Sequence, residues 1–277
     1  MFRKIALSLA ITSLVMGAQA QKLQKGQKVE TVVNMKMNMN IEMMGQNVDN
    51  TTETTNTNDI EVKEASVKGF VVASTTRRII MKANAMGQDI SFDSDKKEDL
   101  DGQMGQAMKG AIGKTDEFQV DNQGVLTDVK MAEREGQAGG FGDMVNVGAA
   151  MAKGQQFPLI MPGNGKKFKV GDTWSDSAGT SETVKTYTNY VIKSISGNEM
   201  VVGLTGKLAK SGVVQQQGME IQMDLNGDFT GDSSYDTASG LLTKNTTVMD
   251  MKGSLGLMGQ SAPLTMKTTI TTVVNKK

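Results

Sequence analysis

Methionines at alternate positions carry the most distinctive chemistry in this sequence of 277 residues. Met35, Met37, Met39 and Met43 fall within residues 29–43, where apolar and polar residues alternate. Because successive side chains of a β-strand point to opposite faces, a strand here would present all four methionines on one face. Thioether sulfur is a soft ligand that suits Cu(I), and methionine is also a flexible side chain that adapts to varied apolar partners. The run therefore predicts an apolar ligand lining, a Cu(I) site or an ordinary packed core.

The apolar lining is our leading hypothesis, with Met104 and Met108 as further lining residues. Same-face neighbours on one strand lie about 6.6 Å apart. Two sulfurs of the 29–43 run would therefore need help from another strand to hold one Cu(I) ion.

No other group of residues supports a catalytic or metal site. The chain contains no His and no Cys, which excludes Ser-His-Asp and Cys-His catalysis and makes structural zinc unexpected. Residues 224–228 begin like a calcium loop, but Phe229 and Tyr235 occupy the positions that require Gly and Glu. We therefore expect a protein that is not an enzyme and that carries no cofactor.

The N-terminus has the three parts of a secretory signal. A basic start precedes an apolar stretch, and Ala18-Gln19-Ala20 supplies the small residues of a cleavage site. The apolar stretch is shorter than the roughly 20 residues that a membrane-spanning helix needs. We expect residues 1–20 to be removed and the protein to be exported, to the periplasm or outside the cell, rather than to be an integral membrane protein.

The charge and the aromatic content argue against two further classes. The chain has 30 basic and 30 acidic residues, and loss of the two basic residues of the signal leaves a net charge of −2. Nucleic-acid binding requires clustered positive charge, so we expect no nucleic-acid partner. Aromatic residues make up only 4% of the chain, too few to supply the two aromatic girdles of an outer-membrane barrel.

Alternation predicts β-structure over most of the chain. Residues 29–43 would span about 50 Å as one strand, and a strand so much longer than usual must bend or coil, as in a half-barrel. Residues 47–63 are rich in Thr and Asn and fit either the return arm of a hairpin or a disordered tip. Further alternation, separated by turn residues, predicts about ten strands in all, including 65–82, 90–92, a hairpin over 118–129, 187–195, 200–208, 219–229, 241–251 and 264–274.

The pattern changes to helical spacing over residues 95–113. A sequence similar to a capping box begins at Asp95, and Gly113 stands where a C-terminal cap would. Internal glycines each cost such a helix about 1 kcal/mol, so it must pack on the sheet to persist. A second, weaker helix is expected near residues 141–151, after a Gly-rich loop.

Residues 158–174 carry a family signature. Pro158-Leu159-Ile160-Met161-Pro162 is followed by Val170-Gly171-Asp172-Thr173-Trp174, which contains the single Trp of the chain. On these residues the chain resembles a group of exported Bacteroidota proteins of unknown function that share a Val-Gly-Asp-x-Trp turn. The resemblance supplies no catalytic residue. We expect Trp174 to be a structural anchor that buries against the sheet, with ligand contact as the alternative.

These observations predict a mainly β protein, built as a long-stranded curved antiparallel sheet or half-barrel with one or two small helices against its concave face. The outline is similar to that of periplasmic lipoprotein-carrier folds. We expect one domain over 21–277, or two halves, 21–130 and 157–277, joined by the Gly-rich segment. The leading function is an exported, non-enzymatic binder of an apolar or lipid-like ligand, and the alternative is a structural or interaction protein of the cell envelope.

Overall fold

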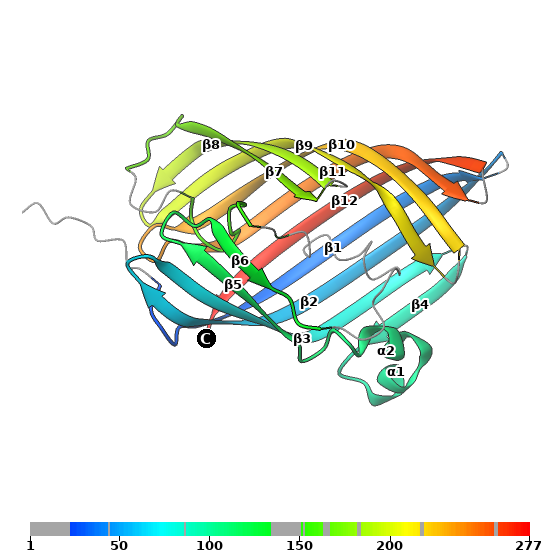
Figure 1. Cartoon of the computed structure of the whole chain (residues 1–277), viewed down its shortest axis with the longest axis horizontal. Helices are drawn as coiled ribbons and strands as arrows, with labels where there is room; N and C mark the ends of the chain where they lie inside the picture. Colours follow the sequence, from blue (N-terminus) through cyan, green and yellow to red (C-terminus); the bar gives the residue numbers. More distant parts are fainter. Residues whose placement is uncertain are drawn as a thin grey trace, which may run out of the picture.

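The protein is one large curved antiparallel sheet, as predicted (Figure 1). The computed structural model describes residues 23–43, 45–85, 87–133, 151, 153–162, 167–181, 184–216, 219–257 and 260–277. Twelve strands join in the order β6-β5-β3-β2-β1-β12-β11-β10-β9-β8-β7, and β4 adds to the far end of β3. The sheet is not closed: β7 forms one edge, and β6 together with β4 forms the other.

Most strands are much longer than the usual 3–10 residues. Their bounds are β1 (Lys28–Met43), β2 (Gln46–Ser66), β3 (Gly69–Ala85), β4 (Gln88–Asp93), β5 (Thr115–Asp121), β6 (Leu126–Lys130), β7 (Thr173–Ser181), β8 (Val184–Ser196), β9 (Glu199–Gln216), β10 (Met219–Asp236), β11 (Leu241–Leu257) and β12 (Gln260–Lys276). Residues 47–63, which the sequence left open between a return arm and a disordered tip, lie in β2 and pair with β1 along its whole length.

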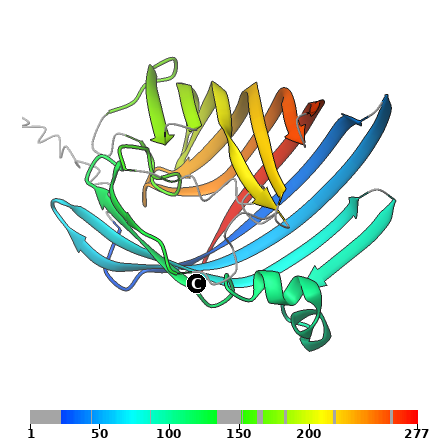
Figure 2. The ribbon, with the colours of Figure 1, turned by 45° about the vertical axis from the view of Figure 1, so that its right-hand side comes forward.

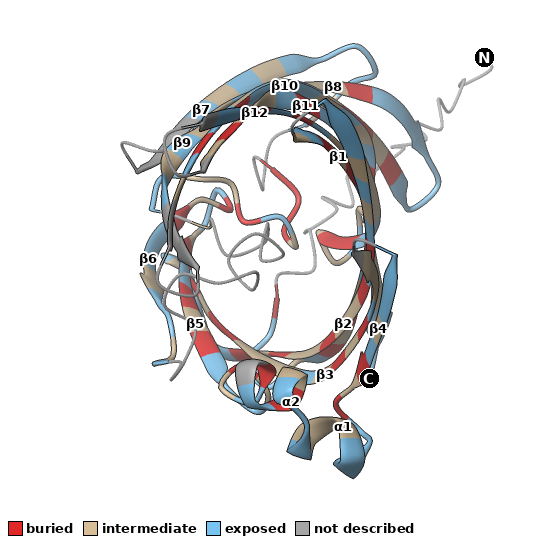
Figure 3. Cartoon of the chain, turned by 90° about the vertical axis from the view of Figure 1, so that its right-hand side faces the viewer, coloured by how far each residue is buried: buried red, intermediate tan, exposed pale blue. Residues whose placement is uncertain are grey.

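The sheet curves around a common axis, and its two faces differ in burial (Figures 2 and 3). In β1 the odd-numbered residues Val29, Thr31, Met35, Met37, Met39 and Ile41 are buried, whereas the even-numbered residues are exposed or half-buried. We call the face that carries these odd-numbered residues of β1 the inner face. Away from the β-bulges, the strand register then assigns the paired residues of the neighbouring strands to the inner or the outer face.

The helical region differs from the single helix predicted over 95–113. It forms two short helices, α1 (Lys97–Asp101) and α2 (Gln103–Met108), and neither has a side-chain N-terminal cap. Gly102 separates them because its backbone is extended, with ψ at 175°. Asp99, rather than a residue at the predicted cap, accepts a hydrogen bond from the backbone N–H of Asp93 at 2.8 Å.

The second predicted helix falls mainly on residues 134–150, which lie outside the described residues, as does the predicted secretory signal. Within the described ranges, no helix has the length and hydrophobicity needed to cross a membrane.

Candidate functional site

The inner face is the candidate site, and methionine is its most frequent large side chain. Among the side chains that the structure describes, the register with β1 places on it ten methionines, from β1, β3, β9, β10, β11 and β12: Met35, Met37, Met39, Met43, Met81, Met200, Met223, Met249, Met251 and Met266. Methionine fills irregular apolar surfaces and adjusts to different partners. The inner face is therefore an adaptable apolar surface rather than a rigid one.

One end of the inner face is filled by the chain itself. Residues 153–162, which we call the end plug, run from β6 to β11. The Phe157 N–H donates to the Gly124 carbonyl at 2.8 Å, and the Leu242 N–H donates to the Leu159 carbonyl at 2.9 Å. The family signature Pro158–Pro162 thus lies in a segment that ties distant strands together.

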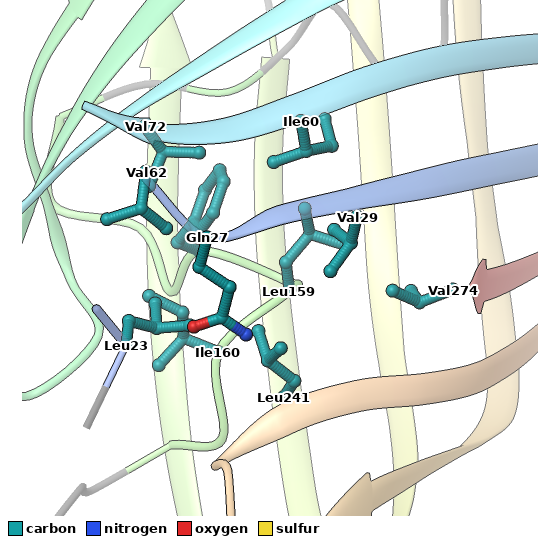
Figure 4. Close-up of a pocket in the computed structure, with 11 residues that line it drawn as sticks. Leu23, Gln27, Val29, Ile60, Val62, Val72, Leu159, Ile160, Leu241 and Val274 are labelled. Atoms are coloured by element: carbon teal, nitrogen blue, oxygen red, sulfur yellow. The ribbon is translucent and has the colours of Figure 1, made fainter. Parts of the chain in front are cut away.

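The end plug packs tightly against the sheet. Phe157 is 2% exposed and its ring centroid lies 5.5 Å from that of Phe118. The small apolar cavity that remains has a volume of about 20 Å³ (Figure 4). It is lined by Leu23, Gln27, Val29, Ile60, Val62, Val72, Phe157, Leu159, Ile160, Leu241 and Val274. Because one water needs about 10–15 Å³ on the same measure, this end has no room for a lipid-sized ligand.

The opposite end of the inner face is formed differently. Its buried apolar residues are Met39, Ile41, Met223, Leu225, Met251, Leu255, Ala262 and Leu264, which we call the methionine cluster. Met43, Leu208, Ile221 and Met266 pack against it in part. All of these residues belong to β1 and β9–β12, so every member within the described part of the chain comes from the sheet.

Three methionines of this end stand side by side. Met39 pairs with Met266 of β12, and Met266 pairs in turn with Met251 of β11. Opposite side chains on neighbouring strands have Cβ atoms about 4.5–5.5 Å apart. The neighbouring strands that would be needed to share one ion are therefore present. This alignment could not be predicted from the sequence, because it depends on the register of strand pairing.

The six methionines predicted as lining residues occupy two apolar clusters and the region between them. Met39 and Met43 belong to the methionine end, while Met104 and Met108 pack with Met81 of β3. Met81 pairs with Thr54 of β2, which pairs with Met35 of β1. Met35, Met37, Met39 and Met43 lie on the inner face, and the polar side chains of β2 separate them from Met104 and Met108. Met35 and Met37 occupy the middle of β1 and are 6% and 2% exposed.

Trp174 lies on the inner face near the β7 edge. Its ring stacks on Tyr190 with centroids 5.0 Å apart and an interplanar angle of 8°, and it lies 5.6 Å from Phe168. The group packs against a buried cluster that contains Ile192 and Met200. The preceding turn uses Gly171 at φ +92°, a conformation that favours glycine.

A polar pair lies beside these aromatic rings. The Tyr190 hydroxyl donates to an Asp176 carboxylate oxygen at 3.1 Å. Burial raises the pKa of Asp176 above its ordinary value, and the hydrogen bond from Tyr190 opposes this rise. This pair was not found from the sequence, because it depends on the pairing of β7 with β8.

A groove near the methionine end has a different character. It has a volume of about 470 Å³ and most of its lining side chains belong to the outer face: Asn38, Asn40, Asp49, Thr51, Asp250, Lys252, Thr265 and Lys267. Lys267 lies 3.6 Å from Asp250 in an ion pair, and the Asn40 amide donates to Asp49 at 2.7 Å. Its walls are polar and their groups partly satisfy one another, so this groove does not suit an apolar ligand.

A family model matches the middle of the chain. Residues 146–242 match a family described as a "Family of unknown function (DUF6263)", and this range includes the 158–174 signature. No curated protein is significantly similar to the chain.

Solved structures show what the fold is similar to. A structure of lipovitellin concerned with lipid–protein interactions has a TM-score of 0.53 and 11% identity, covering 91% of this chain and 25% of that one. An outer membrane channel from Pseudomonas putida F1 has a TM-score of 0.28 and 6% identity, covering 92% and 98% of the two chains. The translocator domain of the autotransporter NalP from Neisseria meningitidis has a TM-score of 0.23 and 8% identity, covering 92% and 90%.

These matches differ in weight. The lipovitellin match shows a shared fold, and this chain spans about a quarter of that chain's length. The two membrane structures score too low to support an argument.

Proposed function

We propose that this chain is an exported, non-enzymatic protein that holds an apolar or lipid-like ligand against the inner face of its sheet. The observation that carries the proposal is the methionine cluster, whose described members all come from the sheet. The end plug fills the other end with apolar side chains of the chain itself, and a ligand would play the equivalent part here. Methionine side chains suit a ligand whose shape varies, as acyl chains do.

Three further observations support this proposal. Lipovitellin, whose structure was described for its lipid–protein interactions, shares the fold over 91% of this chain. The chain has no His and no Cys, the residues on which most nucleophilic and general-base catalysis near neutral pH depends. The N-terminal secretory pattern favours the cell envelope or the outside of the cell as its location.

Native mass spectrometry of the protein, purified from its native source without detergent, tests this proposal. We expect a population that carries the additional mass of a lipid, and the delipidated protein should regain it on incubation with a lipid extract. A mass equal to the bare chain before and after incubation contradicts the proposal. It would leave the alternative, a structural or interaction protein of the envelope with a fully packed core.

The row Met39–Met266–Met251 favours a second candidate function, Cu(I) binding. Three thioethers on neighbouring strands can converge on one soft cation, which a single strand cannot arrange. Anaerobic titration against a chromogenic Cu(I) chelator tests it. We expect the protein to withdraw Cu(I) from the chelator, and Met266→Leu to weaken the withdrawal, with Met200→Leu as the control outside the row. Failure of the unsubstituted protein to compete with the chelator would exclude this function.

A further inference from the structure

The two edges of the sheet are finished differently. At one edge the end plug covers part of β6, because the Leu126 N–H donates to the Gln155 carbonyl at 2.8 Å and the Gly154 N–H donates to the Leu126 carbonyl at 2.8 Å. At the other edge β7 pairs with β8 over Thr173–Ser181, and no strand within the described ranges pairs with its far side (Figure 1). β7 is therefore an edge strand that the described part of the chain does not cover.

β7 lacks the features that usually keep an edge strand from pairing with another chain. Such strands carry Lys or Pro, or are bent by bulges. Thr173–Ser177 contains neither Lys nor Pro, and the irregularity in the pairing with β8 lies further along, between Gly179 and Ser181. Alternate residues of an antiparallel strand direct their N–H and C=O groups away from the first partner. The far side of β7 therefore offers backbone donors and acceptors to a further strand.

The side chains of β7 are compatible with a second copy of the same strand. On the outer face of β7 lie Thr173, Ser175 and Ser177, all exposed. An antiparallel pairing about a two-fold axis at Ser175 places Ser175 opposite itself and Thr173 opposite Ser177 of the second copy. Cross-strand pairs of hydroxyl side chains are favourable. The outer face of β7 is therefore complementary to itself in this register.

The inner face of β7 also selects this register. Asp176 is the single charged residue of Thr173–Ser177, and it accepts a hydrogen bond from the Tyr190 hydroxyl at 3.1 Å. With the axis at Ser175, Asp176 lies opposite Trp174 of the second copy and meets no like charge. An axis at Asp176 would place two carboxylates directly opposite each other, which is unfavourable.

We propose that β7 pairs with β7 of a second copy of this chain, antiparallel and about a two-fold axis at Ser175. The two sheets then join edge to edge, and their inner faces form one continuous surface. This dimer does not depend on the proposed function. A single pair of nine-residue strands buries less surface than a stable interface needs, so we expect a weak dimer that dissociates on dilution.

Disulfide trapping tests the pairing and its register, because the chain has no Cys of its own. With the axis at Ser175, the two Ser175 Cα atoms lie about 4.5–5.5 Å apart, within the roughly 4.4–6.8 Å that a disulfide spans. Ser177→Cys is the matched control, since Ser177 is also exposed on the outer face but lies about 14 Å from Ser177 of the second copy.

The full chain carrying either substitution is treated with a mild oxidant and analysed on a non-reducing gel. We expect Ser175→Cys to give a disulfide-linked dimer and Ser177→Cys to remain monomeric. Equal cross-linking of the two variants, cross-linking of Ser177→Cys alone, or cross-linking of neither would overturn the proposal.

Charge exchange at the axis provides a second test, measured by sedimentation velocity over a series of protein concentrations. Ser175→Lys and Ser175→Glu each place like charges opposite each other, so each should weaken dimerisation about fivefold. An equimolar mixture of the two variants should form a mixed dimer. Thr205→Lys is the control, because Thr205 is exposed on β9, which has a paired strand on both sides. An unsubstituted protein that stays monomeric throughout, or a dimer that neither charge weakens, would contradict the proposal.

Discussion

The two ends of the inner face are apolar surfaces of one sheet, yet they are completed in different ways. At the plug end, Phe157, Leu159 and Ile160 cover the strands and leave a cavity of about 20 Å³. At the methionine end, every described member of the cluster is a strand residue. Their composition also differs: among the described residues, the buried core of the plug end has no Met, whereas the methionine cluster holds Met39, Met223 and Met251.

This difference suits the two ends to different partners, one fixed and one variable. Branched and aromatic side chains with restricted rotamers suit a fixed partner such as the end plug. Methionine suits a partner that changes shape or is exchanged. On the proposed function, the plug end serves the stability of the fold and the methionine end receives the ligand.

The largest expected effect is at the plug end. Phe157→Ala removes a ring that is 2% exposed and contacts Phe118, and we expect it to lower the free energy of unfolding by about 3–5 kcal/mol. Urea denaturation measures this loss. A change below about 1 kcal/mol would show that the end plug does not complete the core, and the comparison would fail.

The second-largest expected effect on stability comes from the close approach of β10 and β11 at the methionine end. A Cβ atom at Gly253 would lie 1.8 Å from the backbone oxygen of Asp224. We expect Gly253→Ala to cost about 1–3 kcal/mol, since the two strands must move apart. Gly256→Ala on the same strand is the control, because its nearest neighbour is the Gln222 Cβ at 3.2 Å. If Gly256→Ala were as destabilising as Gly253→Ala, close contact between the strands would not explain the loss of stability.

Exchanging methionine for leucine sharpens the comparison further. Met223→Leu and Met251→Leu conserve volume and should each cost less than about 1.5 kcal/mol, measured by the same denaturation. Because leucine is less flexible, the double variant should bind a narrower range of acyl-chain lengths than the unsubstituted protein. An unchanged range would mean that methionine at this end has no role in adaptability.

The smallest effect concerns pH at the Asp176–Tyr190 pair. Burial raises the folded-state pKa of Asp176, so the folded state holds its proton more tightly than the unfolded state does. This contribution therefore favours folding at low pH, and it decreases as pH rises from the ordinary Asp pKa through the raised one. Comparing Asp176→Asn with the unsubstituted protein across this window should reveal the slope. Identical pH dependence of the two unfolding free energies would contradict it.

The fold class was predictable from the sequence because its signal is local. Apolar alternation marks long strands, and the prediction of a curved antiparallel sheet with small helices is confirmed. β7 was missed, since Thr173–Ser181 has little apolar alternation and pairs only at the sheet edge. The break at Gly102 was also missed, because helical spacing continues through it.

The site was predictable only in part, because the local sequence pattern does not determine the register in which distant strands pair. The methionines of β1 could be assigned to one face from their spacing alone. Their alignment with Met251 and Met266 depends on how distant strands pair. The assignment of Met35, Met37, Met39, Met43, Met104 and Met108 as ligand-lining residues stays a prediction.

Photo-cross-linking with a monoacylglycerol that bears a diazirine near the end of its acyl chain tests the central claim most directly. The delipidated protein is irradiated with this ligand, and the labelled residues are mapped by mass spectrometry. We predict labels on inner-face residues of the methionine end, including Met39, Met251 and Leu255. Labels confined to the outer face, around Asn38 and Lys267, or to the end plug would contradict the claim that the methionine end holds the ligand.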